Sequence, residues 1–302
     1  MRILVTGGTG FIGRPLCAAL AAAGHELVVL SRDPGSVRAR CGASVSPLAA
    51  LSAWNDDLRI GAVINLAGAP VIDSRWSARR KQELWRSRVT FTEGLAGRIA
   101  QLSHKPAVLL SGSAVGIYGD CGDRCLSEDA APAKDFLAGL CVAWEDAASA
   151  ARAHGVRVCL LRTGLVLHPS GGVLGSMLTP FRLGLGARLG GGRQWMSWIH
   201  LADYIALTLR LLEDPAAQGP CNMTAPGPVT NAEFTATLAR VLRRPAFAAF
   251  PAWLLLGALG ARAAVLLGSQ RVLPVKAGEL GYDFLHPRLE DALRDLVGAD
   301  KA

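Results

Sequence analysis

A cluster of four glycines lies between an apolar segment and a helix-like segment in residues 2–15, RILVTGGTGFIGRP. Glycine weakens any regular element that contains it, so four together indicate that something must come close to the backbone there. Gly7, Gly10 and Gly13 have the spacing GxxGxxG, and Gly8, Gly10 and Gly13 also fit GxGxxG. After a strand and at the start of a helix, this pattern is typical of a turn that binds the pyrophosphate of a dinucleotide.

Strand-like and helix-like segments alternate through the first half of the chain. The strand-like segments are residues 2–6, 26–30, 62–67, 107–112 and 156–162. They lack polar alternation, which indicates that both of their faces are covered, and helical connections between them indicate parallel pairing. The sequence therefore predicts an α/β fold with a Rossmann-type doubly wound parallel sheet.

The pattern changes after the last of these strands. Helices are expected at residues 202–214, 231–242 and 287–297. Asp203 is expected to cap the first of them, and Thr230 and Glu233 have the spacing of a capping box at the second. This part of the chain is predicted to form a smaller, mainly helical substrate lobe.

Two domains follow from these patterns. We predict a dinucleotide-binding Rossmann domain of residues 1–165, with residues 200–230 interleaved into it, and a substrate-side lobe of residues 166–302. In that lobe, the glycine-rich run at 184–193 is expected to form either a wall opposite the nicotinamide or a lobe interface. Its arginines suit an anionic or ring-bearing substrate.

The end of the second strand reads VVLSRDP and indicates which dinucleotide binds. An acidic residue at this point would bond the ribose hydroxyl of NAD, whereas an arginine accommodates the additional phosphate of NADP. Ser31 and Arg32 therefore favour NADP(H), because a guanidinium can bind a phosphate through two hydrogen bonds. Two alternatives stay open: Asp33 could serve NAD, and Arg32 could be a solvated loop residue.

The formal net charge of +8 fits nucleic acid, an acidic membrane surface or an anionic ligand, but simple solubility explains it as well. The basic stretch 75–88 contains no recognised nucleic-acid module, so no nucleic acid is expected as a partner. The seven cysteines have neither disulfide-framework nor metal-site spacing, so no metal is expected.

The most apolar stretch is residues 245–268, which Pro251 and Arg262 interrupt. It predicts buried helices rather than a membrane span, with a peripheral membrane contact as the alternative. We expect a cytoplasmic protein.

Several motifs together resemble a known family. VTGGTGFIG, NLAG at 65–68 and SGSAVGIYG at 111–119 resemble the extended short-chain dehydrogenase/reductase superfamily. RTGLVL, PFRLGLGARLGGGRQWMSWIHLADY and SQRVLP resemble its atypical, epimerase-like subgroup within the NAD-dependent epimerase/dehydratase superfamily. That subgroup has a largely unassigned substrate and a helical C-terminal domain of its own, matched here by about residues 248–296.

The resemblance implies roles for particular positions. Ser31 and Arg32 would hold the adenosine phosphate, Leu66 and Ala67 would line the adenine-ribose side, and a backbone position near Leu165 would meet the nicotinamide. Glu83 and Arg88 would approach the cofactor from a helix, although without the resemblance a helix-surface ion pair is the simpler interpretation. The full set of expected cofactor-binding residues is Gly7, Gly10, Phe11, Ile12, Gly13, Ser31, Arg32, Leu66, Ala67, Gly68, Glu83, Arg88, Ser111 and Leu165.

The superfamily's usual chemistry needs a tyrosine and a lysine four residues apart on one helix face, because the lysine lowers the pKa of the tyrosine. This chain lacks the pair: by analogy with relatives, Leu137 and Cys141 occupy the two positions. Ser113 matches the superfamily's strand-end hydroxyl. Tyr118 could act as a substitute acid, or could simply pack at the lobe boundary. Ser113 and Tyr118 are the expected catalytic residues.

Two functions fit these observations. The first is an NADP(H)-binding oxidoreductase or nucleotide-sugar-epimerase-like protein with an unassigned small-molecule substrate. The second is a catalytically inactive NADPH-binding protein that senses redox state or regulates a partner. No membrane span is expected, and a homodimer could form through the two long helices expected at about 77–103 and 134–154.

Overall fold

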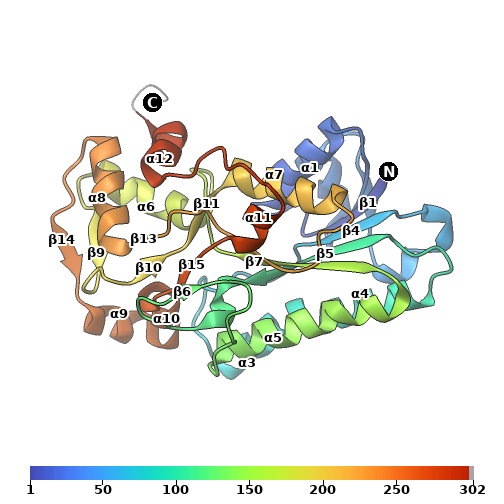
Figure 1. The fold of residues 1–302 in the computed structure, drawn as a ribbon, viewed down its shortest axis with the longest axis horizontal. Helices are drawn as coiled ribbons and strands as arrows, with labels where there is room; N and C mark the ends of the chain where they lie inside the picture. The colour runs from blue at the N-terminus through green and yellow to red at the C-terminus, as the bar shows by residue number, and fades with distance from the viewer. Residues whose placement is uncertain (299–302) are drawn as a thin grey trace.

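The central feature of the molecule is a seven-stranded, all-parallel sheet in the order β12-β7-β5-β4-β1-β2-β3 (Figure 1). The structure is a computed structural model, and it describes residues 1–298. The strands of the sheet are β1 (Arg2–Thr6), β2 (Glu26–Leu30), β3 (Ser46–Leu48), β4 (Ala62–Asn65), β5 (Val108–Ala114), β7 (Arg157–Thr163) and β12 (Gly219–Met223). The predicted α/β fold with a parallel sheet is confirmed.

Helices cover both faces of this sheet. They are α1 (Gly13–Ala22), α2 (Val37–Cys41), α3 (Ala78–Trp85), α4 (Phe91–Gln101), α5 (Phe136–Ser149) and α7 (Leu201–Glu213). Successive residues of a strand point to opposite faces, so Ile3 packs in the cluster of Leu16 from α1, whereas Leu4 packs in the cluster of Leu95 from α4. Burial on both faces explains why the strands show no polar alternation.

A second lobe follows β7 along the chain. Its strands are β8 (Leu165–Leu167), β9 (Ala187–Leu189), β10 (Trp195–Met196), β11 (Trp198–His200), β13 (Val229–Thr230), β14 (Ala248–Phe250) and β15 (Arg271–Val272), together with β6 (Cys125–Leu126). Its helices are α6 (Gly172–Arg182), α8 (Asn231–Leu242), α9 (Ala252–Leu259), α10 (Ala263–Leu267), α11 (Val275–Glu279) and α12 (Leu289–Val297). The strands form two-stranded pairs, and α6, α8 and α12 share a separate apolar core.

Short helical turns connect these elements. The 3-10 turns are Pro34–Ser36, Leu51–Ala53, Asp56–Leu58, Val115–Tyr118, Ala150–His154 and Gly260–Arg262. A π-helical turn, Arg86–Thr90, separates α3 from α4. The single long helix expected at about 77–103 is therefore interrupted.

The chain returns to the large sheet after its first excursion into the second lobe. α7 packs on the face that α1 also covers, and β12 pairs with β7 at the edge of the sheet. Residues 200–230 thus contribute a helix and an edge strand to the Rossmann layer. The exact domain boundaries stay a prediction.

The predicted capping box at the start of α8 is confirmed. The backbone N–H of Thr230 donates to Glu233 (2.7 Å), and the backbone N–H of Glu233 donates to the Thr230 hydroxyl (3.2 Å). The two bonds satisfy N–H groups that would otherwise have no partner at this helix end.

The prediction for the most apolar stretch is wrong over much of its length. α9 contains no buried residue, and Phe247 and Trp253 are 96% and 72% exposed, although Ala263 in α10 is buried. α9 lies at the surface of the second lobe beside α10 (Figure 1), and most of its residues are exposed. None of the described helices has both the length and the apolar character that crossing a bilayer requires.

Candidate functional site

The turn between β1 and α1 has no room for side chains at two of its glycines. A methyl group on Gly13 would lie 2.2 Å from the carbonyl oxygen of Gly7, and one on Gly7 would lie 2.6 Å from the carbonyl oxygen of Leu66. Gly7 also has a φ of +71°, which side-chain-bearing residues rarely adopt. The backbone of this turn is therefore packed directly against the end of β4.

The start of α1 is open to an anion. Ile12 precedes its first residue and provides no side-chain cap, and no acidic residue lies in the first turn. Unbonded N–H groups and the helix dipole both favour negative charge at such an end. Gly10 turns the backbone into the helix through a bond from its N–H to the carbonyl oxygen of Gly7 (3.0 Å).

A buried amide ties together the strand ends below this turn. Asn65, the last residue of β4, accepts from the Thr6 hydroxyl (2.6 Å) and donates to the hydroxyls of Thr92 (2.9 Å) and Ser111 (3.2 Å). Ser111 was expected at the cofactor, but its fully buried hydroxyl is engaged within the sheet. Sequence reasoning missed Asn65, although a polar residue that ends an apolar strand is a visible signal.

The segment after β4 lies against Arg88. A methyl group on Gly68 would be 3.0 Å from the guanidinium carbon of Arg88, and this guanidinium lies 5.3 Å from the ring centre of Trp144. Burial lowers the pKa of Arg88, and no ion pair involves it within residues 1–298. The π-helical turn carries Arg88 to this position; such turns often occur at functional sites.

Glu83 behaves differently from Arg88. Its carboxylate pairs with Arg80 at 2.7 Å; the Glu83 side chain is exposed, whereas only 13% of the Arg80 side chain is. The simpler interpretation of Glu83 and Arg88 as an ion pair with each other is therefore wrong, because Glu83 already has a nearer partner on its own helix. Its approach to a cofactor stays a prediction.

Ser31 and Arg32 follow β2, and the guanidinium of Arg32 lies in solvent. The Ser31 hydroxyl accepts from the backbone N–H of Asp33 (3.1 Å), which fixes a tight turn. Arg32 is exposed, and the described residues contain no ion pair that involves it. Its charge is consequently available to a ligand phosphate.

The glycine-rich turn meets the second lobe through Phe11. A methyl group on Gly171 or Gly172 would lie within 2.8 Å or 3.2 Å of the Phe11 ring, so these glycines allow the ring to pack against the start of α6. Leu165, expected near the nicotinamide, begins β8, and its backbone N–H donates to the carbonyl oxygen of Ser197 (2.8 Å). Phe11 therefore contacts the second lobe, and the place of Leu165 at the nicotinamide stays a prediction.

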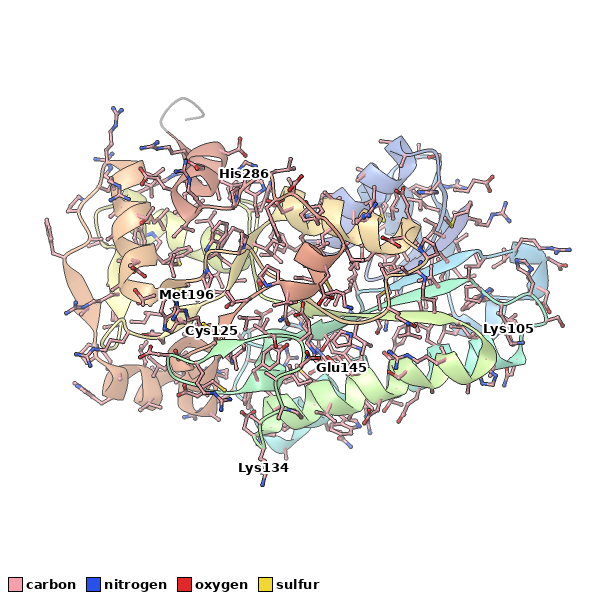
Figure 2. All side chains as sticks on the ribbon, viewed as in Figure 1. Lys105, Cys125, Lys134, Glu145, Met196 and His286 are labelled. Carbon is pink, nitrogen blue, oxygen red and sulfur yellow. The ribbon has the colours of Figure 1, made fainter. Side chains whose placement is uncertain are left out.

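A buried ion pair adjoins Ser113 near the end of β5. Glu145 lies on α5 (Figure 2). The Ser113 hydroxyl donates to Glu145 (2.6 Å), and Arg162 donates to both oxygens of the same carboxylate at 2.9 Å. Burial by itself lowers the pKa of Arg162, but the bonds to Glu145 and its charge outweigh this effect and raise it. The guanidinium of Arg162 therefore keeps its charge inside the protein.

Tyr118 closes the same network. Its hydroxyl donates to the side-chain oxygen of Asn222 (2.7 Å) and accepts from Arg162 (2.9 Å), and only 1% of the residue is exposed. Burial raises the pKa of the phenol, and the opposing effect of Arg162 does not cancel this increase. Tyr118 therefore keeps its proton at neutral pH.

Residues 3–224 match the NAD dependent epimerase/dehydratase family. The chain belongs to this family. Residues 250–296 match a second family, described as a domain of unknown function (DUF1731), which agrees with the helical C-terminal domain expected from the resemblance.

Similar proteins extend this assignment over nearly the whole chain. The chloroplastic SDR39U1 homolog of Arabidopsis thaliana, an epimerase family protein, is 39% identical, with 98% of this chain and 87% of that protein covered. Epimerase family protein YfhF of Bacillus subtilis is 36% identical, with coverage of 100% and 99%. The crystal structure of the human epimerase family protein SDR39U1 with NADPH has a TM-score of 0.87 at 34% identity, covering 98% of this chain and 99% of the human one.

This epimerase family member has no titrating pair on α5 where the tyrosine and lysine were sought. Leu137 has no ionisable group, and burial raises the pKa of the Cys141 thiol to about 12. The polar side chains that do adjoin this helix come from other elements, β5 and β7, and include Ser113 and Arg162. Sequence reasoning missed Glu145 and Arg162, because their pairing is set by the packing of α5 on the sheet.

A second polar cluster connects α7 to the segment that precedes α12. His200, not the expected Asp203, caps α7, and its Nδ1 accepts from the N–H of Ala202 (3.0 Å). Asp203 instead accepts from the backbone N–H groups of Leu285 (2.7 Å) and His286 (2.9 Å). It therefore anchors the segment before α12.

The side chains of this cluster are of the kinds that bind metal ions, but the hydrogen bonds of His200 do not suit a metal ligand. His200, His286 and Asp295 place ligand atoms within 4.8 Å of one another. However, Nδ1 of His200 is an acceptor, so Nε2 of the neutral ring carries the proton and has no lone pair for a metal. The Nε2 atom lies 3.3 Å from Asp295, which suits donation to that carboxylate.

Proposed function

We propose that this epimerase-family chain binds NADP(H) and uses it in an oxidoreductase or epimerase-type reaction on a small molecule. The observation that carries the proposal is the open start of α1 beside glycines that admit no side chain. A pyrophosphate fits such a site, because backbone N–H groups can reach its oxygens and no acidic side chain repels it. The NADPH-bound human relative supports the same assignment.

The residues present fit the phosphorylated form of the dinucleotide. Arg32 is exposed and has no ion-pair partner in the described part of the chain, so it can bind the ribose phosphate through two hydrogen bonds, with Ser31 beside it. The segment Leu66 to Gly68 would border the adenine-ribose side. Arg88 would add positive charge at the end of β4, where no carboxylate neutralises it.

When bound, the coenzyme supplies the hydride chemistry, and the protein supplies orientation and proton handling. We assign to Ser113 the positioning of a substrate oxygen. Glu145 accepts a hydrogen bond from the Ser113 hydroxyl and so fixes the direction of that hydroxyl. We assign to Tyr118 the role of proton donor, because its raised pKa keeps it protonated. Leu165 would border the nicotinamide from β8.

One observation favours the second candidate, an NADPH-binding protein without turnover. The Tyr118 hydroxyl already has a donor and an acceptor inside the protein, and the residue is 1% exposed. A proton donor held in this way must leave Asn222 to reach a substrate. If it does not leave, the chain binds coenzyme and reports its presence to a partner.

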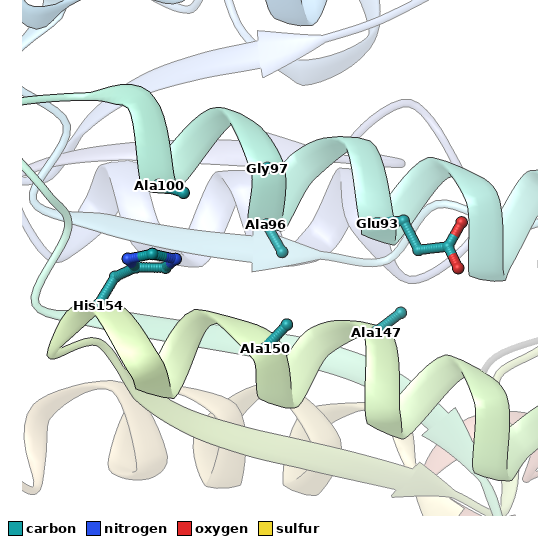
Figure 3. Close-up of a pocket in the computed structure, with 7 residues that line it drawn as sticks. All are labelled: Glu93, Ala96, Gly97, Ala100, Ala147, Ala150 and His154. Atoms are coloured by element: carbon teal, nitrogen blue, oxygen red, sulfur yellow. The ribbon is translucent and has the colours of Figure 1, made fainter.

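We also propose a homodimer through α4 and α5. The two helices run side by side and leave between them a groove of about 280 Å³ (Figure 3). Small residues dominate its lining, which consists of Glu93, Ala96, Gly97, Ala100, Ala147, Ala150 and His154. Helices of a second copy could approach closely there, and a two-fold axis would use the same groove twice. Sedimentation of Ala150→Trp against the parent chain tests this.

A cytoplasmic location is part of the proposal. All seven cysteines are unpaired, and five of them are buried. Free thiols in this number suit a reducing compartment.

A coenzyme titration of Arg32→Asp tests the central assignment. The substitution reverses the charge at the site of the additional phosphate, so NADPH affinity is expected to fall at least tenfold more than NADH affinity. Equal weakening of both coenzymes would contradict the role of Arg32. Nicotinamide absorbance with a panel of sugar nucleotides, ketones and quinones then separates the two candidates, because only the first predicts turnover.

A further inference from the structure

The second lobe presents an apolar surface that the described residues, 1–298, leave exposed. We call it the α9 face; it consists of Leu183, Leu185, Phe247, Phe250, Trp253, Leu254 and Leu256, all of them exposed. A helix that is apolar on all sides is normally buried, yet α9 has no buried residue. Apolar patches larger than isolated residues mark interaction sites on proteins.

The members of the α9 face lie on connected elements. β14 pairs with β9, and the N–H of Gly190 donates to the carbonyl oxygen of Phe250 (2.8 Å). The turn that carries Leu183 and Leu185 contacts the chain just before β14, since a methyl group on Gly184 would lie 3.5 Å from Pro245. In Figure 1, β14 and α9 form the end of the second lobe that is remote from the large sheet.

The two segments that carry the α9 face have charges of one sign. The sequence contains no acidic residue between Asp146 and Asp203, and none between Glu233 and Glu279. Of the exposed arginines in these segments, Arg152 lies by the large sheet and Arg240 pairs with Glu290. The other five lie on or next to the elements that carry the face: Arg182, Arg188, Arg193, Arg243 and Arg244. None of these five forms an ion pair with any residue from 1 to 298.

We propose that the α9 face docks onto the surface of an anionic lipid bilayer. Phe and Trp side chains partition into the boundary between headgroups and acyl chains, and adjacent arginines bind the lipid phosphates. A second copy of the chain fits poorly, because it would bring the same unpaired arginines against one another. With only eight residues, α9 can lie in the interface but cannot cross the bilayer.

This docking leaves the coenzyme region free. The glycine-rich turn follows β1 in the large sheet, whereas the α9 face lies at the other end of the second lobe (Figure 1). A hydrogen bond links the neighbourhood of α9 to the expected coenzyme region. Arg262, just after α9, donates to the carbonyl oxygen of Ile72 (2.8 Å), which lies in the segment that follows Gly68. The membrane proposal goes beyond the proposed function and does not rest on it.

Vesicle sedimentation of the full chain tests the proposal. The vesicles contain either phosphatidylcholine alone or phosphatidylcholine with 30% phosphatidylglycerol, roughly the anionic content of a charged leaflet. Binding is expected only to the anionic vesicles, and high salt is expected to abolish it. Arg243→Ser with Arg244→Ser should weaken binding about thirtyfold, since each arginine near such a surface contributes about 1 kcal/mol.

Matched variants test whether vesicle binding depends on the α9 face or only on the total charge and apolar content of the protein. Phe247→Ser with Trp253→Ser should also abolish binding, whereas Leu285→Ser should not. Arg59→Ser with Arg152→Ser removes the same charge as the Arg243 and Arg244 pair but lies on the other lobe, so binding should persist. Every one of these residues is exposed, so folding is expected to survive, and unchanged NADPH titration checks it.

Quenching by brominated acyl chains gives an independent measure. The tryptophan fluorescence of the protein should fall when it binds anionic vesicles with brominated lipids. Most of this fall should disappear in Trp253→Phe. Absence of binding to anionic vesicles at low salt overturns the proposal. An equal loss of vesicle binding in the control variants would also overturn it. So would concentration-dependent self-association of the parent chain that Phe247→Ser with Trp253→Ser abolishes.

Discussion

The hydroxyl of Ser113 lies 2.6 Å from a carboxylate oxygen of Glu145, which also receives two hydrogen bonds from Arg162. This relationship links the strand-end serine to a buried charge pair that the amino-acid pattern did not reveal. It also fixes the direction of the Ser113 hydroxyl, because the hydroxyl donates its hydrogen bond to this carboxylate.

Glu145→Gln should destabilise the protein strongly. The substitution leaves the buried Arg162 guanidinium without a compensating charge, at a cost of about 3–5 kcal/mol. Urea unfolding measures the change. Glu26→Gln is the matched control, because Glu26 and its partner Arg2 form an exposed ion pair; that change should cost no more than about 0.5 kcal/mol. Similar losses in both variants would contradict the buried pair.

Gly13→Ala should abolish coenzyme binding. Its methyl group would lie 2.2 Å from the carbonyl oxygen of Gly7, so the turn must open and its N–H groups must move. Gly97→Ala is the control, since nothing lies within 4 Å of the new methyl group and alanine favours the helix. NADPH fluorescence titration of the two variants should differ sharply. Retention of normal affinity in Gly13→Ala would show that the turn does not hold the pyrophosphate.

Tyr118→Phe separates stability from coenzyme binding. Loss of the hydroxyl leaves Asn222 and Arg162 each without one buried partner and should destabilise the fold by about 1–3 kcal/mol. NADPH affinity should not change, because no expected phosphate contact involves this residue. If a substrate is found, the turnover rate should fall much more than the affinity for substrate. An unchanged rate would remove Tyr118 from the chemistry and favour the non-catalytic function.

Stability should decrease as the pH falls below neutrality, and His200 should account for part of the loss. Burial lowers the pKa of His200 to about 4; the neighbouring charge of His286 adds to this effect, and Asp295 and Asp203 oppose it. The unfolded chain, with a histidine pKa near 6.5, therefore binds a proton that the folded chain does not. Between pH 7 and 4.5 this difference amounts to about 2 kcal/mol.

His200→Asn tests that assignment, because asparagine can still cap α7 but does not titrate. Urea unfolding at pH 7 and 4.5 should show a smaller pH dependence in the variant than in the parent chain. An identical dependence in both proteins would mean that other groups cause the loss.

Features with local signals could be predicted from the sequence. The glycine-rich turn, the central strands and the capping box at Thr230 depend on neighbouring residues, and all are present. The edge strands β3 and β12 were not foreseen. β3 has only three residues and includes Pro47, and β12 includes Gly219 and Pro220, so neither has the apolar pattern of a central strand.

Features that depend on tertiary packing could not be predicted in this way. Glu145 and Arg162 are paired because α5 packs over β7, and the π-helical turn at Arg86–Thr90 has no distinctive residue pattern. The apolar sequence of α9 predicts burial, and only the fold of residues 1–298 shows that none of its residues is buried. Composition identifies what a segment prefers, whereas the surrounding elements decide whether that preference is met.

Titration of the unmodified chain with NADPH and NADH, followed by nicotinamide fluorescence, tests the central claim most directly. The account predicts saturable binding of NADPH at one site per chain, at least tenfold tighter than NADH, because Arg32 contacts only the additional phosphate. Absence of saturable binding for both coenzymes would contradict it.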